Sequence, residues 1–509
     1  MQRHVKLFLA LLLTTHAWAA LPNGTVWEVR TLGAATNGGG FVTGGTDMSQ
    51  FNNKNAAACT NCQSATVNIS TADVVATGVA TVTSVTANFS AAIVGNIIHL
   101  VGTGITTGFY EVITFTNVTT VILDRSPGTG TATSGIGGAL NSIATLNTAL
   151  GTTNNIQQTA WVKADATYTV TANQSLGPTC TAGTNGCSIQ VNGYTGTRGD
   201  GGYFTIQGTS GSGYTLLTID NNNNLQNLIV RNVTLDCNGL SNSTGFGINA
   251  NGNSGQNIEA KNCGAWGIAL NLSGGNGGLC LNCYSHNNPG AGRSGGFTIG
   301  SQGVASQCIW CVSVANGTAS GTNLAVGFQL NGGSLCAFCI AANNTGSTDA
   351  SEKNEGFYVS NLSGSVMIVN SVAYGNSQDG LRIGVVSNYP FFISNSIFVD
   401  NGGWGINSAS TTYTANAQWE NYNGFFGNTS GAITGLTSGA NDVTLTADPF
   451  TNGAGNVFTL NNTAGAGKAA QGAAFPGTLA GSSGTGYLDI GALQHQVTGT
   501  GAKASPILQ

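Results

Sequence analysis

The chain has 509 residues, of which only 6% are Asp, Glu, Lys or Arg, against roughly 25% in an average globular protein. Its net charge of −5 leaves no basic stripe, which argues against nucleic-acid binding through neutralisation of phosphates. Hydrophobic residues make up 41% of the chain, so a disordered low-complexity protein is excluded as well.

The first 20 residues are predicted to be a secretory signal peptide. Arg3, His4 and Lys6 form a basic start, residues 7–13 are an apolar run, and residues 17–19 form a small-residue cleavage site. The apolar run is too short to cross a bilayer, and no other stretch approaches the ~18 apolar residues of a transmembrane helix. We therefore expect a secreted protein, periplasmic or extracellular, without a membrane span.

Two parts are expected between the signal peptide and the repeats. Residues 21–63 are predicted to hold an N-terminal strand and a loop, and residues 64–135 a small inserted β module. Residues 139–150 then form an amphipathic helix, which we expect to cap the open end of a solenoid. Its apolar face consists of Leu140, Ile143, Leu146 and Leu150.

Residues 136–430 carry an internal repeat. Three Cys-x-x-Cys pairs recur every 28 residues, and a fixed period of this length is typical of a solenoid. Short apolar strands alternate with Asn- and Gly-rich turns, a glycine recurs at one corner, and no helical pattern separates the strands. These features predict a parallel β-helix, continued by C-terminal rungs and a closing segment in residues 431–509. The three pairs are Cys280 with Cys283, Cys308 with Cys311, and Cys336 with Cys339.

In its Asn-rich turns and its x-Gly-apolar corners, the chain resembles the secreted right-handed parallel β-helix proteins of the pectate-lyase-like superfamily. The runs at 448–450, 458–460 and 489–493 are similar to the closing segment of many secreted bacterial β-helix proteins. The resemblance implies an all-β fold, a right-handed parallel β-helix. It implies no single activity, because the superfamily includes lyases, hydrolases, epimerases and viral tailspikes.

The 12 cysteines are an even number, which in an exported protein points to disulfides before metals. Neighbouring rungs lie ~4.8 Å apart, within the Cα separation that a disulfide tolerates. Cross-rung disulfides and a ladder of packed thiols both stay open, whereas a metal site is disfavoured because residues i and i+3 of an extended strand point to opposite faces.

The cysteines that are candidates for disulfides fall into two columns and two local pairs. One column is predicted to hold Cys263, Cys283, Cys311 and Cys339, and a second Cys280, Cys308 and Cys336. The local pairs, each of which could staple a loop, are Cys59 with Cys62 and Cys180 with Cys187.

The best chemical candidates lie in the column that precedes the corner glycines. Glu355 and Asp379 occupy this position on neighbouring rungs, and stacking would bring their carboxylates to roughly 5 Å, the separation used by retaining glycosidases. Trp404, on the next rung, could support a sugar ring. Further charges lie nearby, namely Arg382 after the second glycine and Asp349, Glu352 and Lys353 in the turn before Glu355.

Two enzyme mechanisms fit this column. In a hydrolase, one carboxylate would be the acid and the other the nucleophile or base. In a lyase, the acids would bind Ca²⁺ against a uronate carboxylate, with Lys353 or Arg382 as base and no other cofactor. Against both, an acid before a corner glycine often only accepts hydrogen bonds from the amides of the turn.

Two functions therefore stay open. The first is a secreted β-helix that binds, and in an enzyme form cleaves, a polysaccharide or cell-surface glycan on its long face. The second is a non-catalytic extracellular scaffold, an adhesin or tailspike-like protein, favoured by the low charge and the Asn-, Thr- and Gly-rich surface. The sequence predicts no oligomeric state.

Overall fold

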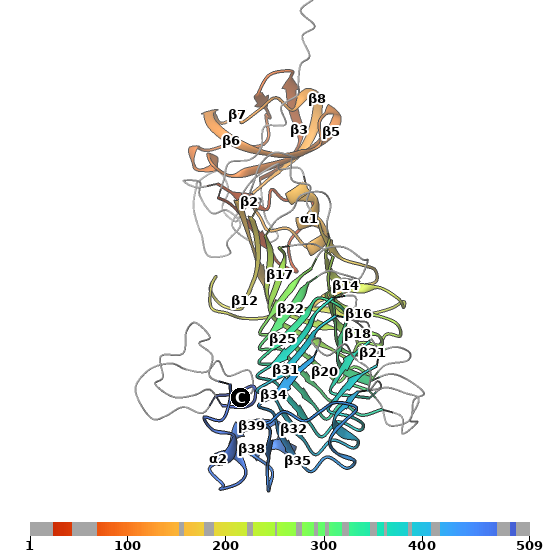
Figure 1. Cartoon of the computed structure of the whole chain (residues 1–509). Helices are drawn as coiled ribbons and strands as arrows, with labels where there is room; N and C mark the ends of the chain where they lie inside the picture. Colours follow the sequence, from red (N-terminus) through yellow and green to blue (C-terminus); the bar gives the residue numbers. More distant parts are fainter. Residues whose placement is uncertain are drawn as a thin grey trace, which may run out of the picture.

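The protein is an elongated stack of β-strand rungs with a small β-barrel at its N-terminal end (Figure 1). The computed structural model describes residues 24–42, 69–151, 157–177, 188–220, 227–249, 252–270, 277–289, 294–300, 305–317, 325–346, 354–360, 364–384, 389–408, 418–475 and 489–494. The predicted parallel β-helix with a capping helix and an added β module is confirmed. The predicted signal peptide lies outside the described residues.

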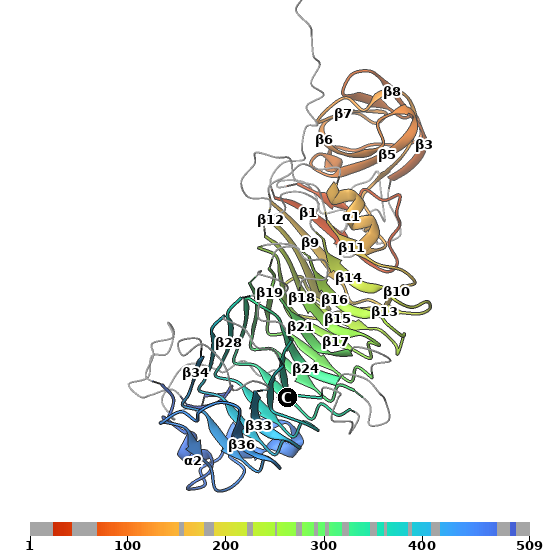
Figure 2. The same ribbon diagram turned by 45° about the vertical axis from the view of Figure 1, so that its right-hand side comes forward.

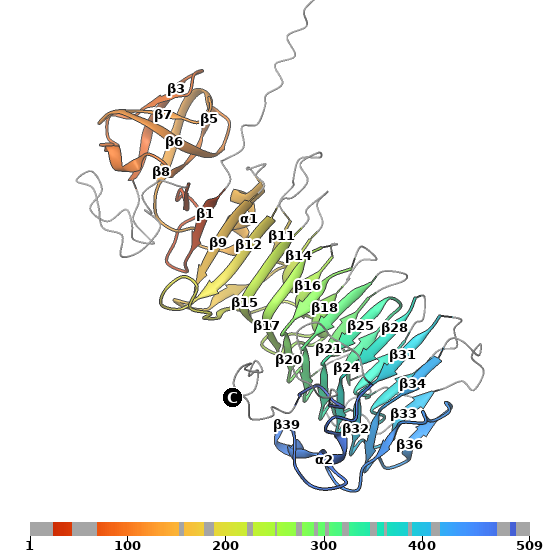
Figure 3. The same ribbon diagram turned by 60° about the vertical axis from the view of Figure 1, so that its left-hand side comes forward.

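Three parallel sheets form the walls of the stack, and their strands run side by side along its length (Figures 2 and 3). Sheet 1 comprises β1 (Thr25–Val29), β9 (Gln157–Lys163), β12 (Ser188–Tyr194), β15 (Leu228–Asp236), β17 (Ser254–Lys261), β19 (Leu279–Leu281), β22 (Ser306–Ile309), β25 (Ser334–Ala337), β28 (Val366–Val369), β31 (Phe391–Ser394) and β34 (Gln418–Asn421). Strands β15 and β17 are long enough to continue into sheet 2.

Sheets 2 and 3 complete each rung. The other strands of sheet 2 are β10 (Tyr168–Val170), β13 (Phe204–Gly208), β20 (Tyr284–His286), β23 (Val312–Val314), β26 (Ile340–Ala342), β29 (Val372–Tyr374), β32 (Ile397–Val399), β35 (Gly424–Phe426) and β37 (Val443–Thr444). Sheet 3 comprises β11 (Ser175–Leu176), β14 (Thr215–Ile219), β16 (Thr244–Ile248), β18 (Trp266–Leu270), β21 (Ser294–Ile299), β24 (Ala325–Leu330), β27 (Phe357–Val359), β30 (Leu381–Ile383), β33 (Trp404–Ser408) and β36 (Gly431–Thr434).

A single left-handed residue makes the turn from sheet 1 to sheet 2. Asparagine suits this position because its short side chain tolerates positive φ. The predicted column that joins Cys263 to Cys283 would place the preceding Asn262 at this turn, and it was wrong at that rung, because Asn262 (φ 55°) belongs to a second left-handed column after sheet 2. The first column, with φ between 49° and 61°, is Asn232, Asn257, Asn282, Trp310, Phe338, Asn370, Asn395 and Tyr422.

An asparagine ladder runs inside the turn between sheets 2 and 3. Each side-chain amide donates to the side-chain oxygen of the next rung, over 2.6 to 2.9 Å. The ladder also explains the recurring corner glycine: a Cβ at Gly380 would lie 2.8 Å from the carbonyl oxygen of Gly405 and 2.9 Å from Nδ2 of Asn401. The ladder consists of Asn288, Asn316, Asn344, Asn376, Asn401 and Asn428.

The interior is filled by stacked apolar side chains in register. The rings of Phe297, Phe328 and Phe357 stack on successive rungs with centroids 4.6 and 5.1 Å apart. On the outside of sheet 2, the chain returns after the last rung and covers the apolar surface from Val312 onward. This return comprises β38 (Phe450–Asn452), η2 (Gly453–Gly455), β39 (Val457–Leu460), α2 (Gly467–Ala470) and residues 489–494.

The N-terminal end is closed by helix α1 (Ile143–Gly151), the short antiparallel strand β2 (Gly40–Phe41) and the barrel. Glu28 of β1 is fully buried there, and its carboxylate accepts hydrogen bonds from Arg30 Nε (2.7 Å), from the Tyr194 hydroxyl and from Arg198 Nη2 (2.6 Å). The barrel has the strand order β3 (Ile69–Thr77), β4 (Thr81–Thr83), β7 (Thr120–Leu123), β6 (Gly108–Asn117), β5 (Ile97–Ile105) and β8 (Gly128–Ile136). The 3₁₀ turn η1 (Ala91–Ile93) precedes β5.

At the C-terminal end of sheet 1, the buried carboxyl group of Glu420 lies beside the half-buried carboxylate of Asp442. Glu420 points inward from β34, and the amide of Gly439 donates to Glu420 Oε2 and to Asp442 Oδ2, both over 2.8 Å. Asn423 Nδ2 donates to the other oxygen of Glu420 over 2.7 Å. Burial, and then the charge of Asp442, raises the pKa of Glu420 to about 8.

Candidate functional site

The predicted column lies at the start of sheet 3 strands. The register pairs Phe357 with Leu381 and Leu381 with Ile406, so Glu355, Asp379 and Trp404 occupy equivalent positions on three successive rungs. Each precedes a corner glycine that packs against the asparagine ladder, which fixes the backbone at this position. The residues therefore meet on the outer side of one corner.

Glu355 is fully buried, and it pairs with Arg382 from the next rung. The distance between Arg382 Nη1 and Glu355 Oε1 is 3.5 Å, and the arginine side chain remains 27% exposed. Arg382 lies on β30, in register with Tyr358 of β27 on the preceding rung. Glu355 thus forms an ion pair with the guanidinium of the next rung.

Asp379 is nearly buried and accepts two hydrogen bonds from the following rung. The Trp404 amide and Asn407 Nδ2 each donate to its carboxylate over 2.7 Å. Burial raises the pKa of Asp379, while the two hydrogen bonds and the charge of Arg382 act in the opposite direction. Asp379 therefore caps the turn of the next rung, as the competing structural interpretation of this residue predicts.

The Trp404 ring is partly exposed and packs along its own column. A Cβ at Gly431 on the next rung would lie 2.7 Å from the ring, so only glycine leaves room for the indole there. Trp266 packs against Gly295 in the same way earlier in the column. The indole is thus held in place by the backbone of the next rung while part of it remains exposed, and a fixed, partly exposed ring is what a sugar-binding platform needs.

The acid–base roles predicted for Glu355 and Asp379 stay predictions, and the geometry sets conditions on them. A general acid or nucleophile has to reach its substrate, yet both carboxylates are buried beneath other side chains. The role as base predicted for Arg382 stays a prediction as well. The remaining candidates, Asp349, Glu352 and Lys353, lie outside the described residues.

Calcium does not fit the described part of this site. Ca²⁺ takes six to eight oxygen ligands, whereas the described corner offers two carboxylates, of which Asp379 already accepts from two donors and Glu355 is already neutralised by a guanidinium. Within the described ranges, no group of three His, Cys, Asp or Glu residues could hold a metal ion. We therefore assign no metal-dependent step to Glu355 or Asp379.

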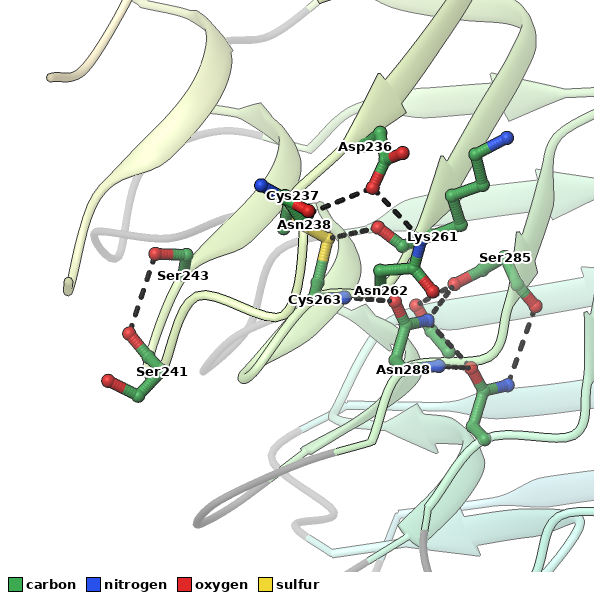
Figure 4. Close-up of a disulfide and its surroundings, with 12 residues drawn as sticks. Asp236, Cys237, Asn238, Ser241, Ser243, Lys261, Asn262, Cys263, Ser285 and Asn288 are labelled. Carbon is green, nitrogen blue, oxygen red and sulfur yellow. Dashed lines mark hydrogen bonds between the residues drawn. A yellow bond between two sulfur atoms is a disulfide. The ribbon is translucent and has the colours of Figure 1, made fainter. Parts of the chain in front are cut away.

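One disulfide is present among the described residues, and it joins Cys263, a predicted candidate, to Cys237, which was not one (Figure 4). Cys263 bonds to Cys237, with a Cα–Cα distance of 4.7 Å between neighbouring rungs. The prediction placed Cys263 in the column of Cys283, because the Asn-Cys pair at 262–263 resembles the one at 282–283. The structure places Cys263 one turn later, where its amide donates to Asn288 at the start of the ladder.

The six cysteines of the repeated Cys-x-x-Cys pairs are free and fully buried. Of the two alternatives left open for these cysteines, the structure shows packed free thiols for all six, so their prediction as disulfide candidates was wrong. The expectation that residues i and i+3 face opposite ways was also wrong for these pairs. The left-handed residue between the two cysteines of a pair makes the corner from sheet 1 to sheet 2, and both cysteines point into the interior. The six, called the solenoid thiols below, are Cys280, Cys283, Cys308, Cys311, Cys336 and Cys339.

The two local cysteine pairs stay predictions. Residues Cys59 and Cys62 lie outside the described residues, and so do Cys180 and Cys187. The loop staples predicted for Cys59 with Cys62, and for Cys180 with Cys187, are therefore neither confirmed nor corrected.

The sequence analysis missed two residues, one that hydrogen-bonds to the candidate site and one that forms the disulfide. Asn407, the partner of Asp379, lies two residues after a corner glycine, the same offset that singled out Arg382. Cys237 belongs to none of the Cys-x-x-Cys motifs, so only its register could have paired it with Cys263. Asn407 could have been found by applying one offset to every rung.

The fold defines a parallel β-helix protein with an N-terminal β-barrel and a polar, arginine-bearing corner. No family model and no curated protein sequence matches the chain. Among solved structures, it is similar to the pectate lyase Pel9A (15% identity, 67% of this chain and 89% of that chain, TM-score 0.42). It is also similar to the A-module of the Azotobacter vinelandii mannuronan C-5 epimerase AlgE4 (14%, 53% and 68%, 0.33) and to an alginate lyase from Paenibacillus sp. str. FPU-7 (12%, 54% and 92%, 0.32).

These similarities concern the fold, as expected at such low identity. None of the described helices is long and apolar enough to cross a membrane.

Proposed function

We propose that the protein is a polysaccharide-binding β-helix and that the corner formed by Arg382, Trp404 and Asn407 contacts the glycan. The carrying observation is the arrangement of this corner. A guanidinium paired with a buried carboxylate lies one rung away from a partly exposed indole. Together they offer fixed hydrogen-bond donors and an apolar ring face, which is what a hydroxyl-rich ring requires.

The buried acids have a positioning part in this proposal. Glu355 orients Arg382, and Asp379 fixes Asn407 together with the amide of Trp404. Binding without cleavage uses all five residues as they lie. Cleavage requires an acid or base that reaches the glycan, so the hydrolase and lyase forms of the hypothesis depend on residues beyond the described carboxylates.

We propose export from the cytoplasm as well, on the strength of the basic and apolar start of the chain.

The test is affinity electrophoresis of the full chain through gels that contain one soluble polysaccharide each, charged and uncharged. Arg382→Ala and Trp404→Ala should each reduce the retardation, whereas Tyr203→Ala, an exposed aromatic residue distant in the sequence, should not. Retention of full binding by both variants would refute the assignment of the corner. Reducing ends or unsaturated products released by the wild type, and lost in Glu355→Gln/Asp379→Asn, would restore the enzyme hypothesis.

A further inference from the structure

The outer face of sheet 1 changes character at β19. Upstream of it the face is polar: Arg231 donates to Gln256 (2.7 Å), Gln190 (2.8 Å) and Asn192 (3.2 Å). From β19 to β34, the outward positions alternate with buried ones and are dominated by large apolar side chains. These side chains, called the apolar stripe, are Leu279, Leu281, Ile309, Leu335, Met367, Val369, Phe392 and Trp419, with Trp310 and Phe338 along one edge.

The stripe is open to solvent. Trp310 is 49% exposed, Met367 38% and Trp419 36%, even though the Trp419 ring contacts Phe475 of the C-terminal return. In the described part of these six strands, none of the outward positions carries Asp, Glu, Lys or Arg. An exposed, contiguous apolar surface without charges is unusual on a folded protein and marks a site of interaction.

Aromatic rings occur in pairs on adjacent rungs of the stripe. The ring centroids of Trp310 and Phe338 lie 6.0 Å apart, and those of Phe392 and Trp419 lie 6.2 Å apart. Met367 lies on the rung between the two pairs. Amide side chains, including Gln307 beside Ile309, share the same surface. Ring faces with amides beside them suit a ligand that has both C–H faces and hydroxyl groups.

The shape of the stripe favours a linear ligand over a protein surface. Six strands at ~4.8 Å and about three residues along each give a footprint of roughly 25 Å by 10 Å. A standard protein interface buries ~800 Å² on each partner, which this footprint does not provide. A narrow, straight and flat surface of this size matches an extended chain that lies across successive rungs, parallel to the axis of the solenoid (Figure 1).

We propose that the apolar stripe binds a linear, uncharged polysaccharide chain, with the Trp310/Phe338 and Phe392/Trp419 pairs stacking on its sugar rings. The lack of charges on the stripe favours uncharged sugars over polyuronates, whose carboxylates would lose water without gaining a partner. The proposal does not rest on the Arg382 corner, which lies on a different sheet and uses a charged group.

The test combines binding with a local probe. A soluble uncharged glucan and a galactomannan serve as ligands, with polygalacturonate as the charged comparison. The double variant Trp310→Ala/Trp419→Ala should weaken binding of an uncharged ligand by about tenfold or more, since each stacked ring contributes to affinity. Tyr203→Ala, with a 40% exposed ring on the polar surface, is the matched control and should bind as the wild type does. Because the Trp419 ring also packs edge to face against Phe475, with centroids 5.4 Å apart, the thermal unfolding midpoint of the double variant should fall slightly, and binding is compared well below that midpoint.

Oxidation of Met367 by hydroxyl radicals gives a readout that the Arg382 corner does not influence. Saturating glucan or galactomannan should slow this oxidation in the wild type and leave it unchanged in the double variant. Binding of an uncharged ligand that is as tight in the double variant as in the wild type, or oxidation of Met367 that no uncharged ligand slows, would overturn the proposal. A stripe that mediates contact with a second copy would also overturn it, and would be revealed as a dimer that the double variant dissociates. Loss of binding in Arg382→Ala alone would leave the proposed function standing while this proposal fails.

Discussion

Replacing Glu420 by Gln should remove a pH dependence of the C-terminal end of the solenoid. Glu420 lies inside the last rung beside Asp442, with its pKa raised to about 8 by burial and by that neighbour. The folded protein therefore keeps this proton up to about pH 8, whereas the unfolded chain releases it near the ordinary glutamate pKa of 4.5. Between these values the folded state binds more protons, so its stability falls as the pH rises.

The difference between a pKa of 4.5 and one of about 8 corresponds to roughly 4–5 kcal/mol, which would be lost progressively over this pH window. In Glu420→Gln, the side-chain oxygen can still accept one of the native hydrogen bonds, and the new amide can donate to Asp442. The variant should therefore resemble the wild type near pH 4.5 and become the more stable of the two as the pH approaches and passes 8.

Hydrogen exchange of the Gly439 and Leu445 amides measures this locally, since both are bonded at this end of the solenoid. After correction for intrinsic exchange, the protection of these amides should fall with pH in the wild type and stay level in Glu420→Gln. Asp442→Asn removes the neighbouring charge and should move the transition to lower pH. Equal pH dependence in wild type and Glu420→Gln would refute the reasoning.

Three further predictions concern other parts of the solenoid. Asn344→Ala interrupts the asparagine ladder and leaves buried amide groups without partners, so urea denaturation should show a loss of about 1–3 kcal/mol or more. Glu28→Ala leaves two arginines near the N-terminal end without their buried carboxylate and should cost about 3–5 kcal/mol, with a fall in the thermal midpoint as the measurement. The solenoid thiols should resist alkylation by iodoacetamide in the native protein and react with it after unfolding without reductant. Peptide mapping of the unfolded protein should still find Cys237 bonded to Cys263. Rapid alkylation of the native protein would contradict the burial of the thiols.

The sequence predicted the architecture because the solenoid repeats its local rules. Alternating apolar residues, the corner glycine and the 28-residue spacing of the cysteines each report a position in the rung, and together they fix the stacking of the sheets. The predicted alignment of the rungs was wrong where both turns of one rung use asparagine. Both Asn257 and Asn262 are left-handed, so an Asn-x pattern does not tell the first turn from the second without the strand between them.

The sequence predicted which residues of the candidate site share a column, but it did not predict the contacts that their side chains make. Register alone brings Glu355, Asp379 and Trp404 to neighbouring rungs, but it does not tell which way a side chain turns at a corner. The direction depends on packing: Asp379 follows the amide offered by the next rung, and Glu355 follows Arg382. The return of the chain over sheet 2 is a long-range contact, for which the local pattern gives no signal.

A two-residue strand lies at each end of the stack formed by sheets 1 and 2. Strand β2 pairs antiparallel with β1 through only two residues, and β37 at the other end is also two residues long. Any stack of parallel rungs exposes unpaired amides and carbonyls at its first and last strand, where another molecule could add and continue the series. Strands this short, one of them reversed in direction, offer little template for such growth.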